Sequence, residues 1–279
     1  MEYKKILTIQ DISCLGQCSL TVALPILSAC GHETVILPSA VLSTHTGGSF
    51  RTSGFTFRDL TEDIPAIQKH WQKEGFTFDG IYTGYLGSIK QIDYVADIFD
   101  TMKKDGAPII CDPAMADNGN LYSIFDMDFV KAMTRLCTKA DIILPNITEA
   151  CLMTGYEYKE KYDEAYVKSL CKAMTDIGIS TIILTGVSYD EKTTGIVVYE
   201  DGNYNYHCHE RLPLTCHGTG DIFASAFTGA YLRGHSLLDA AGIAGDYVLK
   251  CIKCTAGDEE HWYGAKFEPV LGELIKALS

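Results

Sequence analysis

The sequence predicts an α/β fold with three layers, in which helices cover both faces of a doubly wound, largely parallel sheet with an antiparallel edge. Two patterns carry this prediction: short β-branched runs alternate with amphipathic segments of helical length, and a hairpin-like pair of runs follows. With 279 residues, 47% of them hydrophobic, the chain can bury one large core. We therefore expect a single domain that spans residues 1–279.

The predicted parallel strands are short apolar runs along the first two thirds of the chain. They lie at residues 5–9, 34–37, 80–83, 108–111, 141–144 and 181–184. Between most of them, apolar residues recur at helical spacing, which predicts helices at residues 19–30, 60–74, 89–104, 126–139 and 163–177. This alternation is typical of parallel strands joined by helical crossovers.

The antiparallel edge is predicted from two runs at residues 194–199 and 203–208. They flank Asp201 and Gly202, and Asp-Gly is a typical turn of a β-hairpin. From residue 218 onward the chain has a helical pattern almost to its end, with breaks expected at Gly234 and Gly257. His207 and His209 fall on one face of the second run and could bind a metal only if a third ligand approached, so surface positions are the simpler interpretation.

Composition argues against nucleic acid and membranes as partners. The chain has 36 Asp and Glu against 23 Lys and Arg, a net charge of -13, which repels phosphate backbones and anionic lipids. The first residues lack the long apolar region of a signal peptide, and the eleven cysteines are an odd number, several of them within apolar stretches. We therefore expect a cytoplasmic protein.

The strongest local signal is a glycine turn that leads into an apolar helix at residues 218–227. Gly218, Thr219 and Gly220 precede Asp221 there. Unpaired N–H groups at such a helix start can hold an anion, and a carboxylate beside them can take a proton from a hydroxyl group. The same four residues also suit an ordinary helix cap. Considered alone, they indicate a helix cap more strongly than an anion site.

Six further motifs lie after predicted strands, where open α/β sheets bind their ligands. They are Gln10-Asp11-Ile12-Ser13, residues 42–47, residues 83–88, residues 111–115, residues 145–149 and Leu184-Thr185-Gly186. Together with the glycine turn, they resemble the pyridoxal kinase branch of the ribokinase-like kinases, from Lys5 to about Gly234. The resemblance implies ATP-dependent phosphorylation of the 5′-hydroxymethyl group of a vitamin B6 vitamer: pyridoxal, pyridoxamine or pyridoxine.

The resemblance also implies roles for individual residues. It makes Asp221 the general base and assigns the anion hole to Gly218, Thr219 and Gly220. It places Asn146, Thr185 and Gly186 beside ATP, together with Gly218 and Gly220, and it places Glu149, Asp112 and Asp117 near Mg²⁺. Around the vitamer it places Asp11, Thr46 and Tyr85, with Ser13 and His45 nearby. A homodimer and a monovalent cation such as K⁺ are further implications.

The chain departs from the commonest pyridoxal kinase pattern at Asp11, where that pattern has Ser. A carboxylate there could favour an amine-bearing or ring-protonated vitamer such as pyridoxamine, or it could accept a hydrogen bond from a ring hydroxyl. Vitamer preference therefore stays open at this point.

Two alternative functions are also open. One is a hydroxymethylpyrimidine kinase of thiamin synthesis, although that branch typically carries Cys where this chain has Asp221. The other is a binding protein for nucleotide or vitamer without catalysis, although Asp112, Glu149 and Asp221 are all present as acids.

Overall fold

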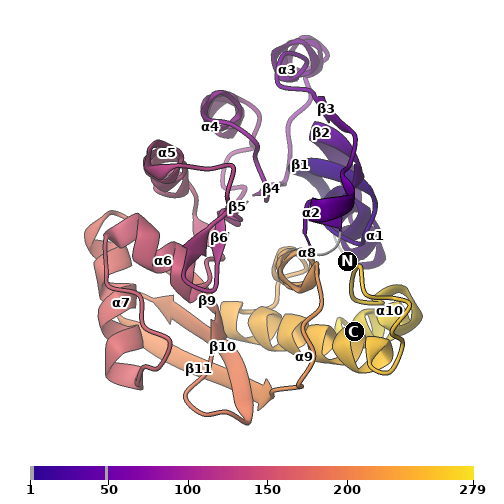
Figure 1. Cartoon of the computed structure of the whole chain (residues 1–279). Coiled ribbons are helices and arrows are strands. Elements are labelled where there is room, and N and C mark those ends of the chain that lie inside the picture. The colour runs from indigo at the N-terminus through magenta and orange to yellow at the C-terminus, as the bar shows by residue number, and fades with distance from the viewer. Residues whose placement is uncertain (1–2, 48–49) are drawn as a thin grey trace.

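The computed structural model describes residues 3–47 and 50–279. It is organised around one nine-stranded sheet, and the strand order of this sheet is β11-β10-β9-β8-β5-β4-β1-β2-β3 (Figure 1). The parallel strands are β1 (Lys5–Leu15), β2 (Glu33–Thr44), β4 (Gly80–Thr83), β5 (Ile109–Cys111), β8 (Ile142–Ile143) and β9 (Thr181–Val187). Antiparallel strands close both edges: β3 (Phe57–Asp59) on one side, β10 (Thr193–Glu200) and β11 (Asn203–Glu210) on the other. The prediction of a single antiparallel edge missed β3, whose three residues are all exposed.

Helices cover both faces of this sheet and confirm the three-layer prediction (Figure 1). One face carries α3 (Ile64–Lys73), α4 (Ile89–Thr101), α5 (Met127–Cys137), α6 (Ile147–Thr154) and α7 (Glu164–Asp176). The other carries α1 (Leu20–Ala29), α8 (Thr219–Leu232), α9 (Leu237–Thr255) and α10 (Leu271–Ala277), the last preceded by the short 3-10 helix η1 (Glu268–Val270). The apolar strands between them are buried on both faces, as expected for parallel strands.

Local sequence explains where four of the helices begin and how the hairpin turns. The side chains of Ser88, Asp126, Asp163 and Ser236 accept hydrogen bonds from N–H groups in the first turns of α4, α5, α7 and α9. Asp201 and Gly202 both adopt positive φ, 51° and 80°, as the tight turn between β10 and β11 requires. The predicted hairpin is therefore confirmed.

Several strands extend beyond their predicted ends, β1 and β2 the furthest. β1 continues to Leu15 with an irregular register between Gln10 and Ile12, and β2 continues to Thr44. Asp11 and Ser13 consequently lie within a strand, where the sequence prediction placed them after one. The extension was missed because it buries polar side chains, which interrupt the apolar run by which strands are recognised.

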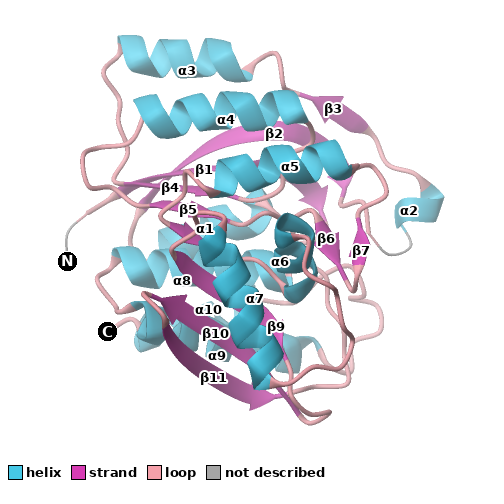
Figure 2. Ribbon diagram, turned by 90° about the vertical axis from the view of Figure 1, so that its left-hand side faces the viewer, coloured by secondary structure: helices cyan, strands magenta, loops and turns pink. Residues whose placement is uncertain are grey.

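The order of the strands fixes where a ligand can bind. β1 pairs with β2 on one side and with β4 on the other, so the chain changes direction across the sheet at this point. Ligands of open α/β sheets bind outside the carboxyl ends of strands at such a switch point. Figure 2 shows that β3, the short helix α2 (Phe50–Ser53) and the ribbon of β6 (Ala116–Asp117) and β7 (Asn120–Leu121) gather at one end of the sheet.

Within residues 3–47 and 50–279, no helix has both the length and the apolar character that crossing a bilayer requires.

Candidate active site

The glycine turn before α8 forms the centre of the site. Gly218 adopts φ 78° at the N-cap, and a Cβ atom there would overlap the main-chain oxygen of Gln17. A Cβ atom on Gly220 would instead meet nothing within 4 Å. The turn therefore packs against the β1–α1 loop on one side and leaves open space on the other. That open side, next to the unpaired N–H groups of the helix start, suits an anion.

Asp221 lies in the first turn of α8 and is linked to Asp11 through one residue. The backbone N–H of Ser19 faces the Asp221 carboxylate and favours its ionised form, which lowers the pKa of Asp221. The Ser19 hydroxyl donates to Asp11 Oδ1 at 2.5 Å, and the Ser13 hydroxyl donates to Asp11 Oδ2 at 2.9 Å. The structure thus brings together three residues that the sequence assigned to the vitamer and the base, and it adds Ser19, which no motif indicated.

Burial raises the pKa of the Asp221 carboxyl to about 7, the Asp11 charge adds to this increase, and the Ser19 N–H opposes it. A carboxylate with such a pKa can accept a proton near neutral pH and later release it. Burial also raises the pKa of Asp11, although the Ser19 and Ser13 hydroxyl groups counteract the change.

Glu149 is buried at the start of α6 and fastens a neighbouring turn. Its carboxylate accepts the backbone N–H groups of Asn146 at 3.0 Å, Met115 at 2.9 Å and Ala116 at 3.3 Å. The Asn146 side chain completes a capping box by accepting the Glu149 N–H at 3.0 Å. Burial raises the pKa of Glu149 to about 7 despite these hydrogen bonds. Glu149 therefore fixes the strand-to-loop turn that leads to Asp117.

The acidic residues predicted near Mg²⁺ lie around one region. Burial raises the pKa of Asp112 well above its ordinary range, and the charges of Glu149 and Asp221 add to this effect. Asp117 is exposed on β6. Desolvation raises the pKa of the Tyr122 hydroxyl although 42% of this residue is exposed, and the charges of Glu149 and Asp117 add to this increase. Sequence analysis missed Tyr122, because a lone tyrosine after a short ribbon carries no motif.

These acids suit a magnesium ion that takes only some of its ligands from the protein. The described residues hold no group of three or more His, Cys, Asp or Glu side chains arranged for a metal. Mg²⁺ commonly takes one or two carboxylates together with phosphate oxygens and waters, so a complete protein cage is not required. The mutual repulsion of Asp112, Glu149 and Asp221 is the kind of charge excess that a bound cation relieves.

The residues assigned to ATP meet beside this acidic group. Asn146 and Thr185 form a bridge between neighbouring strand ends, and the Thr185 N–H donates to the Pro145 carbonyl at 2.9 Å. Gly186 is exposed and adopts φ 70°. Three of the five residues predicted to bind ATP therefore lie together, Asn146 just after β8 and Thr185 and Gly186 in the last residues of β9, while Gly218 and Gly220 belong to the glycine turn.

On the vitamer side, Tyr85 follows β4 with its ring half-buried, 5.8 Å from the ring of Phe125 between centroids. Burial raises the pKa of Tyr85, and the Asp11 charge contributes, so the two side chains belong to one site. Thr46 is exposed beyond β2. His45 uses both ring nitrogens: Nδ1 accepts the Gly47 N–H at 3.0 Å, and Nε2 donates to the Tyr263 carbonyl at 2.9 Å.

A C-terminal segment, residues 261–268, closes over the glycine turn and the β1–α1 loop. His261 Nε2 donates to Gln17 Oε1 at 2.8 Å, and Gln17 Nε2 donates to both carboxylate oxygens of Glu268. The Ala265 N–H donates to the His217 carbonyl at 3.2 Å. The motifs ended near Gly234, so this contribution was invisible in the sequence: it depends on contacts between residues about 250 positions apart.

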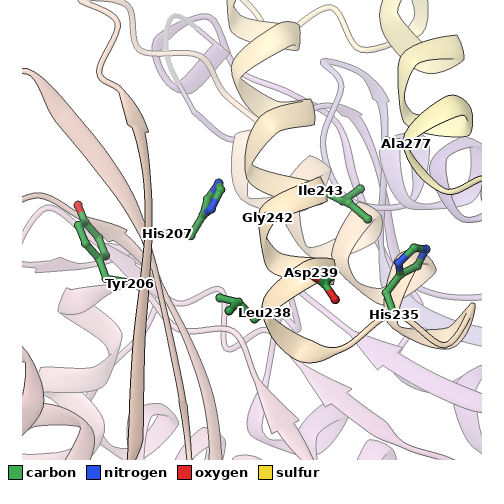
Figure 3. A pocket seen from close by; sticks show the side chains of 8 residues that line it. All are labelled: Tyr206, His207, His235, Leu238, Asp239, Gly242, Ile243 and Ala277. Atoms are coloured by element: carbon green, nitrogen blue, oxygen red, sulfur yellow. The ribbon is translucent and has the colours of Figure 1, made fainter.

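A separate cavity of about 530 Å³ lies between β11 and α9 and contains none of the predicted site residues (Figure 3). His207 lines it, and its Nε2 atom lies 3.6 Å from Asp246 Oδ1. Asp246 thus approaches one of the two strand histidines, but the described residues include no metal-binding group of three.

Comparisons with known proteins agree with this geometry. Residues 52–267 match the family model described as phosphomethylpyrimidine kinase. A candidate phosphomethylpyrimidine kinase from Bacteroides thetaiotaomicron, in a crystal form with pyridoxal, is 39% identical, with a TM-score of 0.91 over 98% of this chain and 96% of that chain. Pyridoxal kinase from Lactobacillus plantarum is 28% identical, with a TM-score of 0.90 over 99% and 98% of the two chains.

A curated relative points to thiamin metabolism. The thiamine biosynthesis multifunctional protein ThiED of Corynebacterium efficiens is 26% identical over 233 residues, which cover 83% of this chain. The chain spans only 30% of the length of that larger protein.

Proposed function

The chain belongs to the phosphomethylpyrimidine kinase family, and from that premise we propose that it transfers the γ-phosphoryl group of ATP to the 5′-hydroxymethyl group of a vitamin B6 vitamer. The observation that carries this proposal is Asp221, held in the first turn of α8 beside a glycine turn with one open side. The relative crystallised with pyridoxal supports a B6 vitamer as the acceptor.

In the proposed reaction, Asp221 accepts the proton of the hydroxymethyl group while the hydroxyl oxygen bonds to the γ-phosphorus. The bond between that phosphorus and the oxygen bridging to the β-phosphate breaks, and ADP leaves with the electron pair. The N–H groups of residues 218–220 stabilise the negative charge on the transferring group. The Ser19 N–H, which faces the Asp221 carboxylate, would favour the ionised form that accepts the proton.

Magnesium enters the proposal with the nucleotide. Asp112 and Asp117 would hold the ion directly or through water, and the ion neutralises phosphate charge when it is bound. Glu149 supports this site by fixing the Met115–Ala116 turn through its three backbone hydrogen bonds.

The remaining site assignments are also proposals. Asn146, Thr185 and Gly186 lie side by side at the strand ends and would contact the phosphates of ATP. Thr46 and Tyr85 would contact the vitamer, with the flat face of Tyr85 against its ring. A homodimer, a requirement for a monovalent cation such as K⁺, and a cytoplasmic location are further predictions from the resemblance and the composition.

A second candidate, hydroxymethylpyrimidine kinase, is favoured by the family description and by the thiamine biosynthesis relative. The test is ADP release with MgATP and, separately, pyridoxal, pyridoxamine, pyridoxine and hydroxymethylpyrimidine. We expect the highest kcat/KM with a B6 vitamer. Turnover of hydroxymethylpyrimidine alone would replace the substrate assignment, and nucleotide binding without any turnover would support a non-catalytic protein.

A further inference from the structure

Asp11 is enclosed within β1 and its carboxylate already has two hydroxyl partners. Its exposed fraction is 4%. Oδ1 accepts the Ser19 hydroxyl at 2.5 Å, and Oδ2 accepts the Ser13 hydroxyl at 2.9 Å. Short hydrogen bonds to a carboxylate are about twice as strong as those between neutral groups. A side chain held in this way is better suited to fixing its neighbours than to recognising a ligand.

Ser19 connects Asp11 with Asp221. Its backbone adopts φ 55° and ψ −129°, an unfavourable conformation that non-glycine residues rarely take. In this conformation its hydroxyl donates to Asp11 at 2.5 Å, while its N–H faces the Asp221 carboxylate and lowers the pKa of that group. A bridge between Ser19 and Ile12 ties the same residue to β1. One residue in an unfavourable conformation therefore spans the two carboxylates.

The same loop also forms one wall of the glycine turn. Gln17 adopts φ 45°, and its main-chain oxygen occupies the position that a side chain on Gly218 would need. A displacement of Ser19 would therefore disturb both the base and the N–H groups beside it. The Asp11–Ser19 hydrogen bond therefore acts together with the Ile12–Ser19 bridge to fix this loop to the sheet, and it is the one of the two that a side-chain substitution can remove.

We propose that Asp11 is a positioning residue for phosphoryl transfer: through Ser19 it holds the Asp221 carboxylate in place, and it does not select the vitamer. The inference rests on the proposed role of Asp221 as the base. It replaces the expectation that an Asp at this position changes vitamer preference.

The test compares Asp11→Ala and Ser19→Ala with the parent, using pyridoxal and pyridoxamine separately. Either substitution removes the hydrogen bond that fixes Ser19, and a misplaced catalytic group costs up to about a hundredfold in rate. We expect kcat to fall roughly tenfold to a hundredfold, by the same factor for both vitamers, with each KM within about threefold of the parent. Because both act through one contact, the double variant should lose no more than the worse single variant.

Thr21→Val is the matched control. Thr21 lies in the first turn of α1, where its hydroxyl donates to the Cys18 carbonyl at 2.7 Å instead of to Asp11 or Asp221. Its removal should leave kcat within about twofold of the parent, since this substitution keeps the Asp11–Ser19 hydrogen bond. Thermal unfolding of each variant identifies any that fail to fold.

The pH dependence of kcat in Asp11→Asn is a measurement that a purely structural role of Asp11 would leave unchanged. Asn keeps an oxygen that accepts the Ser19 hydroxyl but removes the charge that helps to raise the pKa of Asp221. The acid limb of the kcat profile should therefore move to lower pH. The titratable groups whose charges act with Asp221 are Asp11, Cys18, Tyr82, Asp112 and Tyr122.

The possible outcomes separate this inference from the proposed function. The positioning role would be overturned if folded Asp11→Ala or Ser19→Ala kept the parental kcat. It would also be overturned if the ratio of pyridoxamine to pyridoxal turnover changed while kcat for one vitamer was preserved. If Asp11→Ala does not fold, Ser19→Ala and Asp11→Asn decide the question. Parental turnover in Asp221→Ala would instead contradict the assignment of the base itself.

Discussion

A Cβ atom on Gly218 would overlap the main-chain oxygen of Gln17, whereas the same atom on Gly220, two residues later, would meet open space. Gly218 is thus required by the fold, because it combines close contact with φ 78°. Gly220 has no such requirement, and the space beside it is where the proposed mechanism places a phosphoryl group. Within one turn, Gly218 therefore serves the fold, and Gly220 leaves room for the proposed reaction.

The substitutions Gly218→Ala and Gly220→Ala should accordingly have opposite effects. Gly218→Ala should lower the free energy of unfolding by about 1–3 kcal/mol or more, because of positive φ and steric overlap. Gly220→Ala should change it by less than about 1 kcal/mol, since Ala suits a helix, yet it should abolish most turnover by filling the anion site. Urea unfolding and ADP release measure the two effects. A fully active Gly220→Ala variant would contradict the anion hole.

The rate should depend on pH through Asp221. Burial raises the pKa of this carboxyl to about 7, and only the ionised form can accept a proton. We expect kcat/KM to fall as the pH decreases below about 7, and to do so with both pyridoxal and pyridoxamine, whose own ionisations differ. An acid limb that appears only near pH 4 would show that the carboxyl is not buried in the working enzyme.

The same carboxyl should lower stability at neutral pH. Its pKa in the folded protein, about 7, lies above the ordinary value of 3.8, so folding favours the protonated form and the cost of the charge is fully present above pH 7. Asp221→Asn should therefore raise the free energy of unfolding by about 1–4 kcal/mol at pH 8. The gain should shrink as the pH falls from 7 toward 4. Equal stability of parent and variant at pH 8 would contradict this.

Glu149 and Asp117 should respond differently to substitution although both are acids near the nucleotide. Glu149→Ala leaves three backbone N–H groups without their acceptor and should lower the free energy of unfolding by about 2–4 kcal/mol. Asp117→Asn changes an exposed side chain and should leave stability within about 0.5 kcal/mol, while it raises the Mg²⁺ concentration that half-maximal turnover requires. A magnesium titration at fixed ATP measures this; an unchanged Mg²⁺ requirement in Asp117→Asn would remove that residue from the site.

The sequence predicted the layers of the fold because helix and strand patterns are local. It also indicated Asp221 and the glycine turn, since their motif is contiguous. It missed the extension of β1, because the buried polar side chains of Asp11 and Ser13 do not resemble a strand. It missed Ser19 and residues 261–268, because their roles depend on contacts that only the folded chain makes, such as His261 with Gln17.

Glu149 has one role in its own helix and another in the packing of the site. In its own helix it is a first-turn acid that forms the capping box of α6 with Asn146. Its proximity to Asp112 and Asp221 is a tertiary feature that helical propensity does not contain. Its proposed role near magnesium therefore depends on the fold and stays a prediction.

The most direct test of the central claim is the rate of vitamer phosphate formation by the parent and by Asp221→Asn, with saturating MgATP and each B6 vitamer. Asn matches Asp in size and can still accept the Ser19 N–H, so the comparison isolates the loss of the proton acceptor. We predict that kcat falls by about a hundredfold to ten-thousandfold while the variant stays folded. A folded Asp221→Asn variant that forms the phosphate at the parental rate would contradict the claim that Asp221 is the base.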